Sequence, residues 1–294
     1  MRHLSDHNIL SDCQYGFRKC RSTGDLLTFL TESWSYSFRD FGENFAVGLD
    51  ISKAFDRVWH KSLISKLTSY GFYPSLCTFI SSFLSDRSIA AVVDGHCSSP
   101  KTINSGVPQG FVLSPTLFLL FINDLLNLTQ CPIHSYADDT TLHYSTAYNR
   151  RPTQQQLNDS RRDAIGRLTS DLSLFSDWGR ENLVLLNASK TQFLQLSTRH
   201  TLPDNYPLFF NTTQLPLSST LNTLGRSFTK NLNWKIHIST LAKSASKKLC
   251  VLWRLRPFSI LPAACSVQGP YPSLYGVLFA YLGGSTHTAL LNKV

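Results

Sequence analysis

The segment of residues 133–144 restricts the fold more than any other part of this sequence. Two short β-prone runs, residues 133–136 and residues 140–144, flank the tripeptide Ala137-Asp138-Asp139. Runs this short and this close together predict a β-hairpin, because only a tight turn can join them. The turn of this hairpin would carry two adjacent carboxylates.

A second strand is expected over residues 45–50, and it also ends on a carboxylate, Asp50. Large and small side chains alternate along it, which is the period of a β-strand. After the strand, Ser52 can cap a helix whose apolar positions recur at helical spacing: Phe55, Val58, Trp59, Leu63 and Leu67. In a parallel or mixed sheet, functional residues often lie between the end of a strand and the start of the next helix, as this carboxylate does.

Further helices are expected before and after these strands. Residues 28–38 have a helical pattern, and the apolar run of residues 111–122 predicts a buried core helix. Residues 150–159 are polar and predict a surface connection, which a helix follows to about Trp178. Nearer the C-terminus, residues 238–252 carry an apolar helical stripe, and three basic side chains project from the opposite side: Lys243, Lys247 and Arg254.

Composition limits the class of protein. The chain has 294 residues, 42% apolar and 16% charged, which suits one large or two modest globular domains. The N-terminus lacks the apolar stretch of a secretory signal, and no apolar run reaches the roughly 20 residues of a membrane-spanning helix. We therefore expect a cytoplasmic or nuclear protein with no membrane partner. Seven cysteines without a Cys-x-x-Cys pair disfavour a disulfide framework or a structural zinc site.

The basic charge is concentrated in the second half of the chain. Residues 1–150 hold 12 Lys and Arg against 13 Asp and Glu, whereas residues 151–294 hold 16 against 6. No acidic residue follows Asp204. A surface of this kind attracts polyanions such as nucleic acids, although a solvated basic face without a partner is the alternative.

Five blocks, in order, resemble the reverse transcriptases of non-LTR retrotransposons. The resemblance covers residues 12–256, and its order and spacing are more specific than any single block. The blocks are Gln14-Tyr15-Gly16-Phe17-Arg18 with Ser22-Thr23; Leu49-Asp50-Ile51-Ser52-Lys53-Ala54-Phe55-Asp56-Arg57-Val58; Ser105-Gly106-Val107-Pro108-Gln109-Gly110 with Leu113-Ser114-Pro115; Tyr136-Ala137-Asp138-Asp139; and Leu185-Leu186-Asn187 with Lys190-Thr191. Beyond them, Leu224-Gly225 and Asn233-Trp234 resemble the start of the family's thumb segment.

The resemblance implies an α+β fold of the right-hand polymerase type. We expect an antiparallel palm sheet flanked by helices, with partial fingers and a helical thumb remnant. The expected divisions are residues 1–197 for partial fingers and palm, 198–260 for the palm end and basic thumb, and 261–294 for a degenerate tail.

The implied activity is RNA-directed DNA polymerisation, in which a primer 3′-hydroxyl attacks the α-phosphate of a deoxynucleoside triphosphate. Two metals can stabilise the charge on the attacking and leaving oxygens, and Mg²⁺ prefers carboxylate ligands. We expect Asp50 and Asp138, supported by Asp139, to bind two Mg²⁺ ions, with Mn²⁺ as a possible substitute. Asp56 is expected to have a structural role at the helix start. Lys190 resembles the lysine that protonates the leaving pyrophosphate.

Other residues of the blocks are expected to contact nucleotide and nucleic acid. The resemblance places Phe55 under the sugar, where it would exclude a 2′-hydroxyl; a core aromatic is the equal alternative. Ile51, Gln109 and Gly110 complete the expected nucleotide site, although Phe111 stands where the family more often has Ser or Thr. The expected contacts to RNA template and DNA primer are Arg18, Lys53, Lys243, Lys247 and Arg254, with solvated surface as the alternative for the first two.

Two other functions compete with an active polymerase. The chain begins near the family's second block, and residues 265–270 and 283–285 interrupt the helical thumb, so an inactive truncated remnant that at most binds nucleic acid is the main alternative. A two-metal nuclease would use the same acids but would have no use for Phe55 or the Pro108-Gln109-Gly110 turn.

Overall fold

The computed structural model describes residue 4 and residues 7–39, 42–146, 152–199 and 206–255. The chain divides into two units, Met1–Asn233 and Trp234–Val294. Among the described helices, none combines the length and apolar character needed to cross a membrane. The predicted tail of residues 261–294 lies outside the described residues.

A four-stranded antiparallel sheet forms the centre of the first unit. Its order is β6-β7-β1-β8, from strands β1 (Glu43–Leu49), β6 (Ile133–Tyr136), β7 (Asp139–Thr146) and β8 (Gln192–Leu196). The predicted hairpin is confirmed: Tyr136 pairs with Asp139, and Ala137 and Asp138 form the turn. The predicted strand at residues 45–50 is also confirmed, with β1 ending one residue before Asp50.

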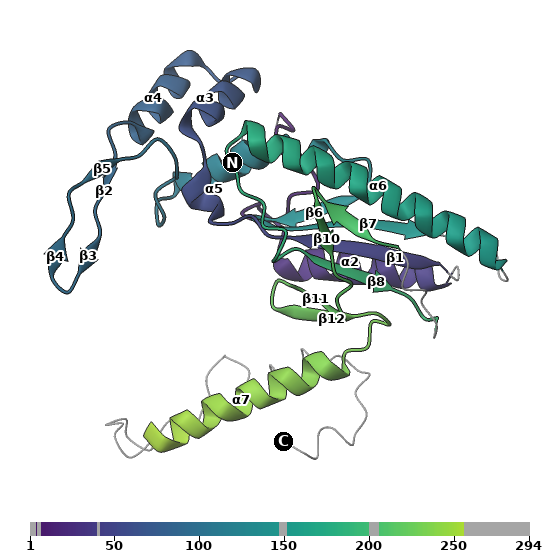
Figure 1. Ribbon diagram of the computed structural model, residues 1–294. Coiled ribbons are helices and arrows are strands. Elements are labelled where there is room, and N and C mark those ends of the chain that lie inside the picture. Colours follow the sequence, from purple (N-terminus) through teal and green to yellow (C-terminus); the bar gives the residue numbers. More distant parts are fainter. Residues whose placement is uncertain (1–3, 5–6, 40–41, 147–151, 200–205, 256–294) are drawn as a thin grey trace. The chain divides into compact units, whose positions relative to one another are not determined.

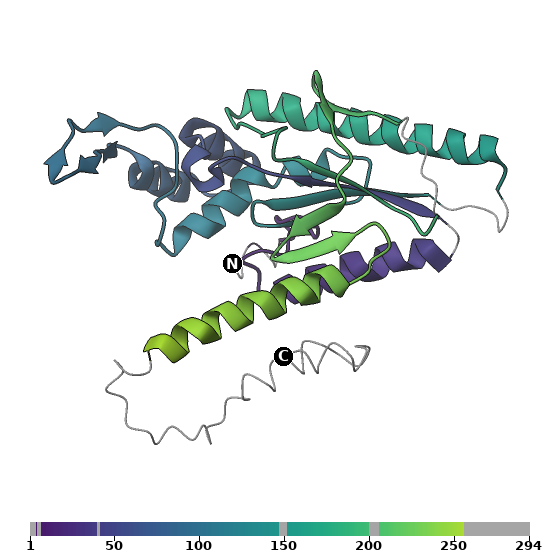
Figure 2. The same ribbon diagram turned by 60° about the horizontal axis from the view of Figure 1, so that its bottom comes forward.

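Helices cover the sheet on both faces. Helix α6 (Gln154–Glu181) lies over one face, while α2 (Thr23–Arg39) and the hairpin of β11 (Thr220–Thr223) and β12 (Arg226–Thr229) lie over the other (Figures 1 and 2). Phe45 and Val47 of β1 are fully buried in the main apolar core. This two-sided cover leaves the ends of the strands as the accessible part of the sheet.

Helix α6 begins earlier than the polarity of residues 150–159 predicts. Thr153 accepts a hydrogen bond from the Gln156 backbone N–H, and the Gln156 side chain accepts one from the Thr153 N–H. This capping box satisfies backbone donors at the helix start, so three polar glutamines belong to the helix. The predicted surface connection is therefore wrong for residues 154–159.

The helix predicted from Ser52 is also corrected. A short 3-10 turn, η1 (Ala54–Arg57), is followed by a separate helix, α3 (His60–Ser69), with Trp59 as its N-cap. The carbonyls of Phe55 and Val58 accept hydrogen bonds from Val107 and Gly106. Because these tertiary bonds occupy carbonyls that a continuous helix would use itself, the helix is interrupted.

A slender ribbon extends from one end of the first unit (Figure 1). It consists of the pairs β2 (Ser88–Ile89) with β5 (Lys101–Thr102) and β3 (Val92–Val93) with β4 (His96–Cys97), all exposed. Helices α3, α4 (Pro74–Leu84) and α5 (Leu113–Ile122) and the 3-10 turn η2 (Leu125–Asn127) precede or follow it in the chain. The predicted core helix is confirmed, because α5 is buried from Leu117 to Ile122.

The remaining elements of the first unit are short strands. Strands β9 (Leu208–Phe210) and β10 (Thr213–Leu215) form a hairpin, and β9 contacts α6. The described part of the second unit is α7 (Lys235–Leu255), which confirms the predicted C-terminal helix. Lys243, Lys247 and Arg254 all belong to this helix.

Candidate active site

The sheet brings Asp50 and the hairpin acids to the same edge. Leu49 pairs with Thr140, and Tyr136 pairs with Asp139 at the turn. Asp50 directly follows Leu49, and Asp139 directly precedes Thr140, so both aspartates lie next to the last residue pair of β1 and β7. Asp50 is nearly 90 positions from Asp138 and Asp139 in the sequence. The three residues nevertheless lie at one edge of the sheet, which we call the acidic edge.

The electrostatics of this edge favour a cation. Burial raises the pKa of the Asp139 carboxyl above its usual value, the negative charges of Asp138 and Asp50 raise it further, and a backbone hydrogen bond from Leu224 opposes the shift. A raised pKa from like charges means that the carboxylates repel one another. A positive ion between them would remove that repulsion.

Asp50 is only loosely paired. Its Oδ2 atom is buried and accepts no hydrogen bond, while the Lys190 ammonium lies 3.6 Å away. The position of this lysine follows from its loop: the Asn187 backbone N–H donates to the Asp50 carbonyl, and the Lys190 N–H donates to the Asn187 carbonyl. The predicted residues Asp50 and Lys190 thus lie together, and the buried Oδ2 atom of Asp50 forms a loose ion pair with this lysine.

The residues at this edge suit a hard divalent ion in kind. Carboxylate oxygens are the ligands that Mg²⁺ and Mn²⁺ prefer, and Asp50, Asp138 and Asp139 supply carboxylates here. In the described part of the chain, no three His, Cys, Asp or Glu side chains are gathered closely enough to enclose an ion. The sheet brings the carboxylate ligands to one edge, and in this structure their side chains do not enclose a metal ion.

The predicted nucleotide block packs directly against the residues after Asp50. The Val107 N–H donates to the Phe55 carbonyl at 2.9 Å, and the Gly106 N–H donates to Val58. Phe55 is half-buried, stacked on Phe118 with ring centroids 4.5 Å apart and edge-on to Phe17. Its ring is therefore partly a core aromatic while part of it stays accessible.

The other predicted nucleotide contacts differ in accessibility. Gln109 is exposed and its Nε2 donates to Asp56 at 3.4 Å, so the Asp56 carboxylate interacts with this block. Gly110 is exposed with φ 87°, a backbone conformation that favours glycine. Ile51 is 6% exposed and forms an isolated bridge with Leu186, which leaves its backbone rather than its side chain for contacts.

The predicted nucleic-acid contacts fall into three groups. The Arg18 Nη1 donates to the backbone carbonyls of Ser11 and Gln14, and burial lowers the pKa of this side chain. Lys53 is exposed, in a left-handed backbone conformation beside Asp50 in sequence. Lys243 and Lys247 are on α7, in the second unit. The structure thus ties Arg18 to the chain's own carbonyls.

Two contributors to this region were not predicted. Leu224, in the turn between β11 and β12, supplies the backbone hydrogen bond to Asp139. Below the β6–β7 turn, the buried Gln14 contacts the backbone of Ala137. No periodicity marks either residue, because Leu224 acts through its own backbone and Gln14 binds the backbone of a residue that is distant in the sequence.

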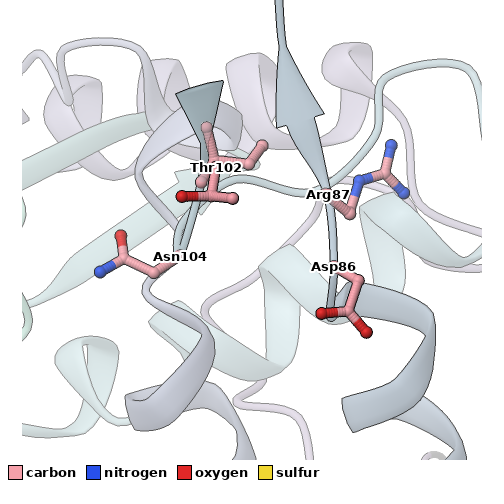
Figure 3. A pocket seen from close by; sticks show the side chains of 5 residues that line it. Asp86, Arg87, Thr102 and Asn104 are labelled. Carbon is pink, nitrogen blue, oxygen red and sulfur yellow. The ribbon is translucent and has the colours of Figure 1, made fainter. Parts of the chain in front are cut away.

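Two cavities lie away from the acidic edge. One of about 340 Å³ is at the base of the ribbon, lined by Asp86, Arg87, Thr102, Ile103 and Asn104 (Figure 3). The other, of about 500 Å³, is lined by residues of η1, the end of α6 and the following loop, and the β9–β10 turn. None of the predicted site residues lines either cavity.

Comparisons with known proteins identify the family of the chain. Residues 1–227 match the family model for reverse transcriptase (RNA-dependent DNA polymerase). The probable RNA-directed DNA polymerase from transposon BS of Drosophila melanogaster is 28% identical over 258 residues, 84% of this chain and 27% of that protein. The RNA-directed DNA polymerase from mobile element jockey of the same species is 29% identical over 302 residues, 96% of this chain and 30% of that protein.

The chain thus spans less than a third of the length of these two relatives. Among solved structures, apo telomerase from Candida tropicalis aligns with a TM-score of 0.50 at 11% identity, covering 79% of this chain and 38% of that chain. A likeness at this identity concerns the fold alone.

Proposed function

Because this chain belongs to the reverse transcriptase (RNA-dependent DNA polymerase) family, we propose that it extends a DNA primer by copying an RNA template. The predicted resemblance to non-LTR retrotransposon reverse transcriptases and the predicted polymerase fold are confirmed by the family match, the relatives and the fold. The substrates and partners we propose are deoxynucleoside triphosphates, a DNA primer and an RNA template.

One observation supports the proposal: β1 ends one residue before Asp50, its partner β7 begins at Asp139, and the charges of Asp138 and Asp50 both act on the Asp139 carboxyl. We propose that they hold two Mg²⁺ ions, for which Mn²⁺ can substitute. Such ions, when bound, stabilise negative charge on the attacking and leaving oxygens of nucleotidyl transfer. A family of nucleotidyltransferases that generally uses divalent metals supports this assignment.

Lys190 and Phe55 would act on the incoming nucleotide. The Lys190 ammonium, 64% exposed and 3.6 Å from Asp50, can deliver a proton to the leaving pyrophosphate. The half-buried Phe55 is held by Phe17 and Phe118, so its ring offers a firm surface under the sugar that would exclude a 2′-hydroxyl. We place Gln109, Gly110 and the Ile51 backbone beside that nucleotide.

Nucleic-acid binding is proposed for four cations. Lys53 is exposed and three positions after Asp50 in the sequence, while Lys243, Lys247 and Arg254 are on α7. We leave Arg18 out of this set, because its guanidinium donates to the carbonyls of Ser11 and Gln14. Contacts from such cations to phosphates add affinity that is independent of base sequence and falls with salt.

Primer extension on poly(rA)·oligo(dT) with Mg²⁺ tests the activity. The wild-type chain should add deoxynucleotides, and Asp138→Ala should abolish the addition while leaving the circular dichroism spectrum unchanged. If a folded wild-type sample extends no primer, the polymerase assignment fails and an inactive nucleic-acid-binding remnant is the better description.

The salt dependence of duplex binding tests the cations of α7. Replacing Lys243, Lys247 and Arg254 together should lower the slope of log affinity against log salt by nearly three, because each phosphate that a cation neutralises adds about 0.9 to that slope. An Lys53→Met variant serves as a comparison outside α7. A slope that is unchanged in the triple variant would exclude α7 from the binding surface.

A further inference from the structure

We propose that Gln14 is a positioning residue that holds the β6–β7 turn in one conformation, and with it the backbone of Asp138 and Asp139, the residues that we propose as metal ligands. The inference rests on the proposed function. Gln14 touches none of the reacting groups assigned above; its side chain contacts the backbone of Ala137, the residue before Asp138. The sequence places Gln14 in the first of the five blocks and implies no role for it.

The Gln14 amide is bound on both sides. Its Oε1 accepts from the Ala137 N–H at 2.9 Å and from the Gly16 N–H at 2.8 Å. Two N–H donors on one atom identify that atom as the oxygen of the amide. Its Nε2 donates to the Ser135 hydroxyl at 3.3 Å and, more weakly, towards the Ala137 carbonyl at 3.5 Å.

The chain around Gln14 is fixed to the hairpin by its backbone. The Tyr15 N–H donates to the Ser135 carbonyl at 2.7 Å, and the Ser135 N–H donates to the Cys13 carbonyl at 2.8 Å. Segment 13–15 therefore lies beside β6 as a short parallel extension of the sheet. The Gln14 carbonyl in turn accepts from the Arg21 Nη1 at 3.0 Å.

The turn needs this support because Ala137 has φ 58°, a left-handed conformation that is unfavourable for alanine. Ala137 is 5% exposed, so its N–H would have no water to replace the glutamine oxygen. Gly16 fits the same contact: a Cβ at that position would lie 2.4 Å from the Ala137 nitrogen. Glutamine and glycine together allow the segment to close against the turn.

Two hydroxyls complete a buried polar cluster under the turn. The Ser135 Oγ donates to the Ala137 carbonyl at 2.8 Å and lies 3.0 Å from the Thr140 Oγ1. Gln14, Ser135 and Thr140 are each no more than 2% exposed. A fully bonded buried cluster of this kind specifies a single local geometry. Here the cluster specifies the geometry of the backbone on both sides of Asp138 and Asp139.

The test compares Gln14→Leu with a matched control, Gln195→Leu. Gln195 is another buried glutamine of the same sheet, 6% exposed, and its amide points to Glu43 at the other end of β1. Both variants lose a buried amide, so both should lower the melting temperature. Only Gln14→Leu should alter the acidic edge.

Two measurements separate positioning from stability. Mn²⁺ affinity, followed by electron paramagnetic resonance without nucleotide, should fall by about tenfold in Gln14→Leu and stay within about twofold in Gln195→Leu, as for residues that orient metal ligands. In primer extension, kcat should fall by a similar factor while the KM for the nucleotide changes little. Equal Mn²⁺ affinity and kcat in the two variants would overturn the proposal.

A milder variant covers the case in which Gln14→Leu does not fold. Ser135→Ala removes one hydroxyl from the same cluster and should weaken Mn²⁺ binding and kcat in the same direction, by about threefold. Unchanged values in a folded Ser135→Ala sample would overturn the proposal. Failure of the polymerase assignment looks different: the wild-type chain itself then extends no primer, whatever residue 14 is.

Discussion

The two ends of strand β1 carry acidic residues in opposite situations. At one end, Glu43 is fully buried and its carboxylate accepts two hydrogen bonds from Arg161, at 2.7 and 2.8 Å, and one from Ser197 at 2.9 Å. At the other end, Asp50 has an oxygen without a hydrogen bond and a lysine 3.6 Å away. One strand thus presents a satisfied carboxylate and an unsatisfied one.

The difference separates a structural acid from a candidate catalytic one. Glu43 joins β1 to α6 and β8, and its bonds leave no room for an outside ligand. Asp50 shares its edge with two further acids, and the negative charges of Asp138 and Asp50 add to the effect of burial in raising the pKa of Asp139. The candidate site is therefore marked by acids that lie close together and have few hydrogen-bond or ion-pair partners, rather than by burial or charge alone.

The largest expected effect is on the activity of Asp50→Asn. Primer extension should fall by about 10³-fold, because several kcal/mol of charge stabilisation correspond to roughly three powers of ten in rate. The free energy of unfolding should change by less than about 1 kcal/mol, since the pair with the exposed Lys190 is weak. Urea melts alongside the kinetics check both parts, and a large loss of stability would contradict the comparison.

Glu43→Gln should show the reverse pattern. Removing the negative charge from this buried ion pair with Arg161 should cost about 3–5 kcal/mol of unfolding free energy. The rate of extension per folded molecule should stay near that of the wild type. Asp159→Asn is the control: its pair with Arg162, the neighbour of Arg161, is exposed and should be worth less than about 1 kcal/mol. Equal costs for the two variants would remove the distinction between the ends.

A buried histidine pair in the same sheet sharpens the comparison further. Both ring nitrogens of His143 are buried without a hydrogen-bond partner, and its ring stacks with His134 at 5.5 Å. Burial lowers the pKa of His143 to about 3 and that of His134 to about 4, from an ordinary value near 6.5. The charge of His134 also lowers the pKa of His143, and no carboxylate contributes to either pKa shift, so we expect an effect on stability alone.

The direction of the pH effect follows from proton uptake. Below pH 6.5 the unfolded chain protonates both histidines while the folded protein does not, so the unfolding free energy falls as pH drops from about 6.5 towards about 4. Each histidine contributes at most about 1.4 kcal/mol per pH unit. His143→Leu should flatten the slope over this interval in urea melts at several pH values. A variant with the wild-type slope would show that His143 titrates normally in the folded protein.

The local pattern of residues was sufficient for the strand before Asp50, the hairpin around Asp138, the core helix and the C-terminal helix. Each of these depends on side-chain periodicity or turn chemistry within a few positions, and such signals are present in the sequence itself. The order of the blocks was also sufficient for the family, as the comparisons confirm. The roles assigned to single site residues remain predictions.

Local pattern was insufficient where one segment supplies the hydrogen bonds of another. The helix after Ser52 is interrupted because Gly106 and Val107 bond the carbonyls of Val58 and Phe55. Arg161 is the exception that the sequence could have revealed, since a charge on the apolar stripe of α6 requires a buried partner.

Gln14 shows the limit most clearly. Its partners in the hairpin, Ser135 and Ala137, are more than 120 positions away, and Ala137 contributes only backbone atoms, which every residue possesses. The side-chain types of residues 133–144 are therefore sufficient to predict that the aspartates lie at a turn. Only the closed tertiary structure decides what fixes that turn, because backbone hydrogen bonds between distant segments leave no periodic signal in either one.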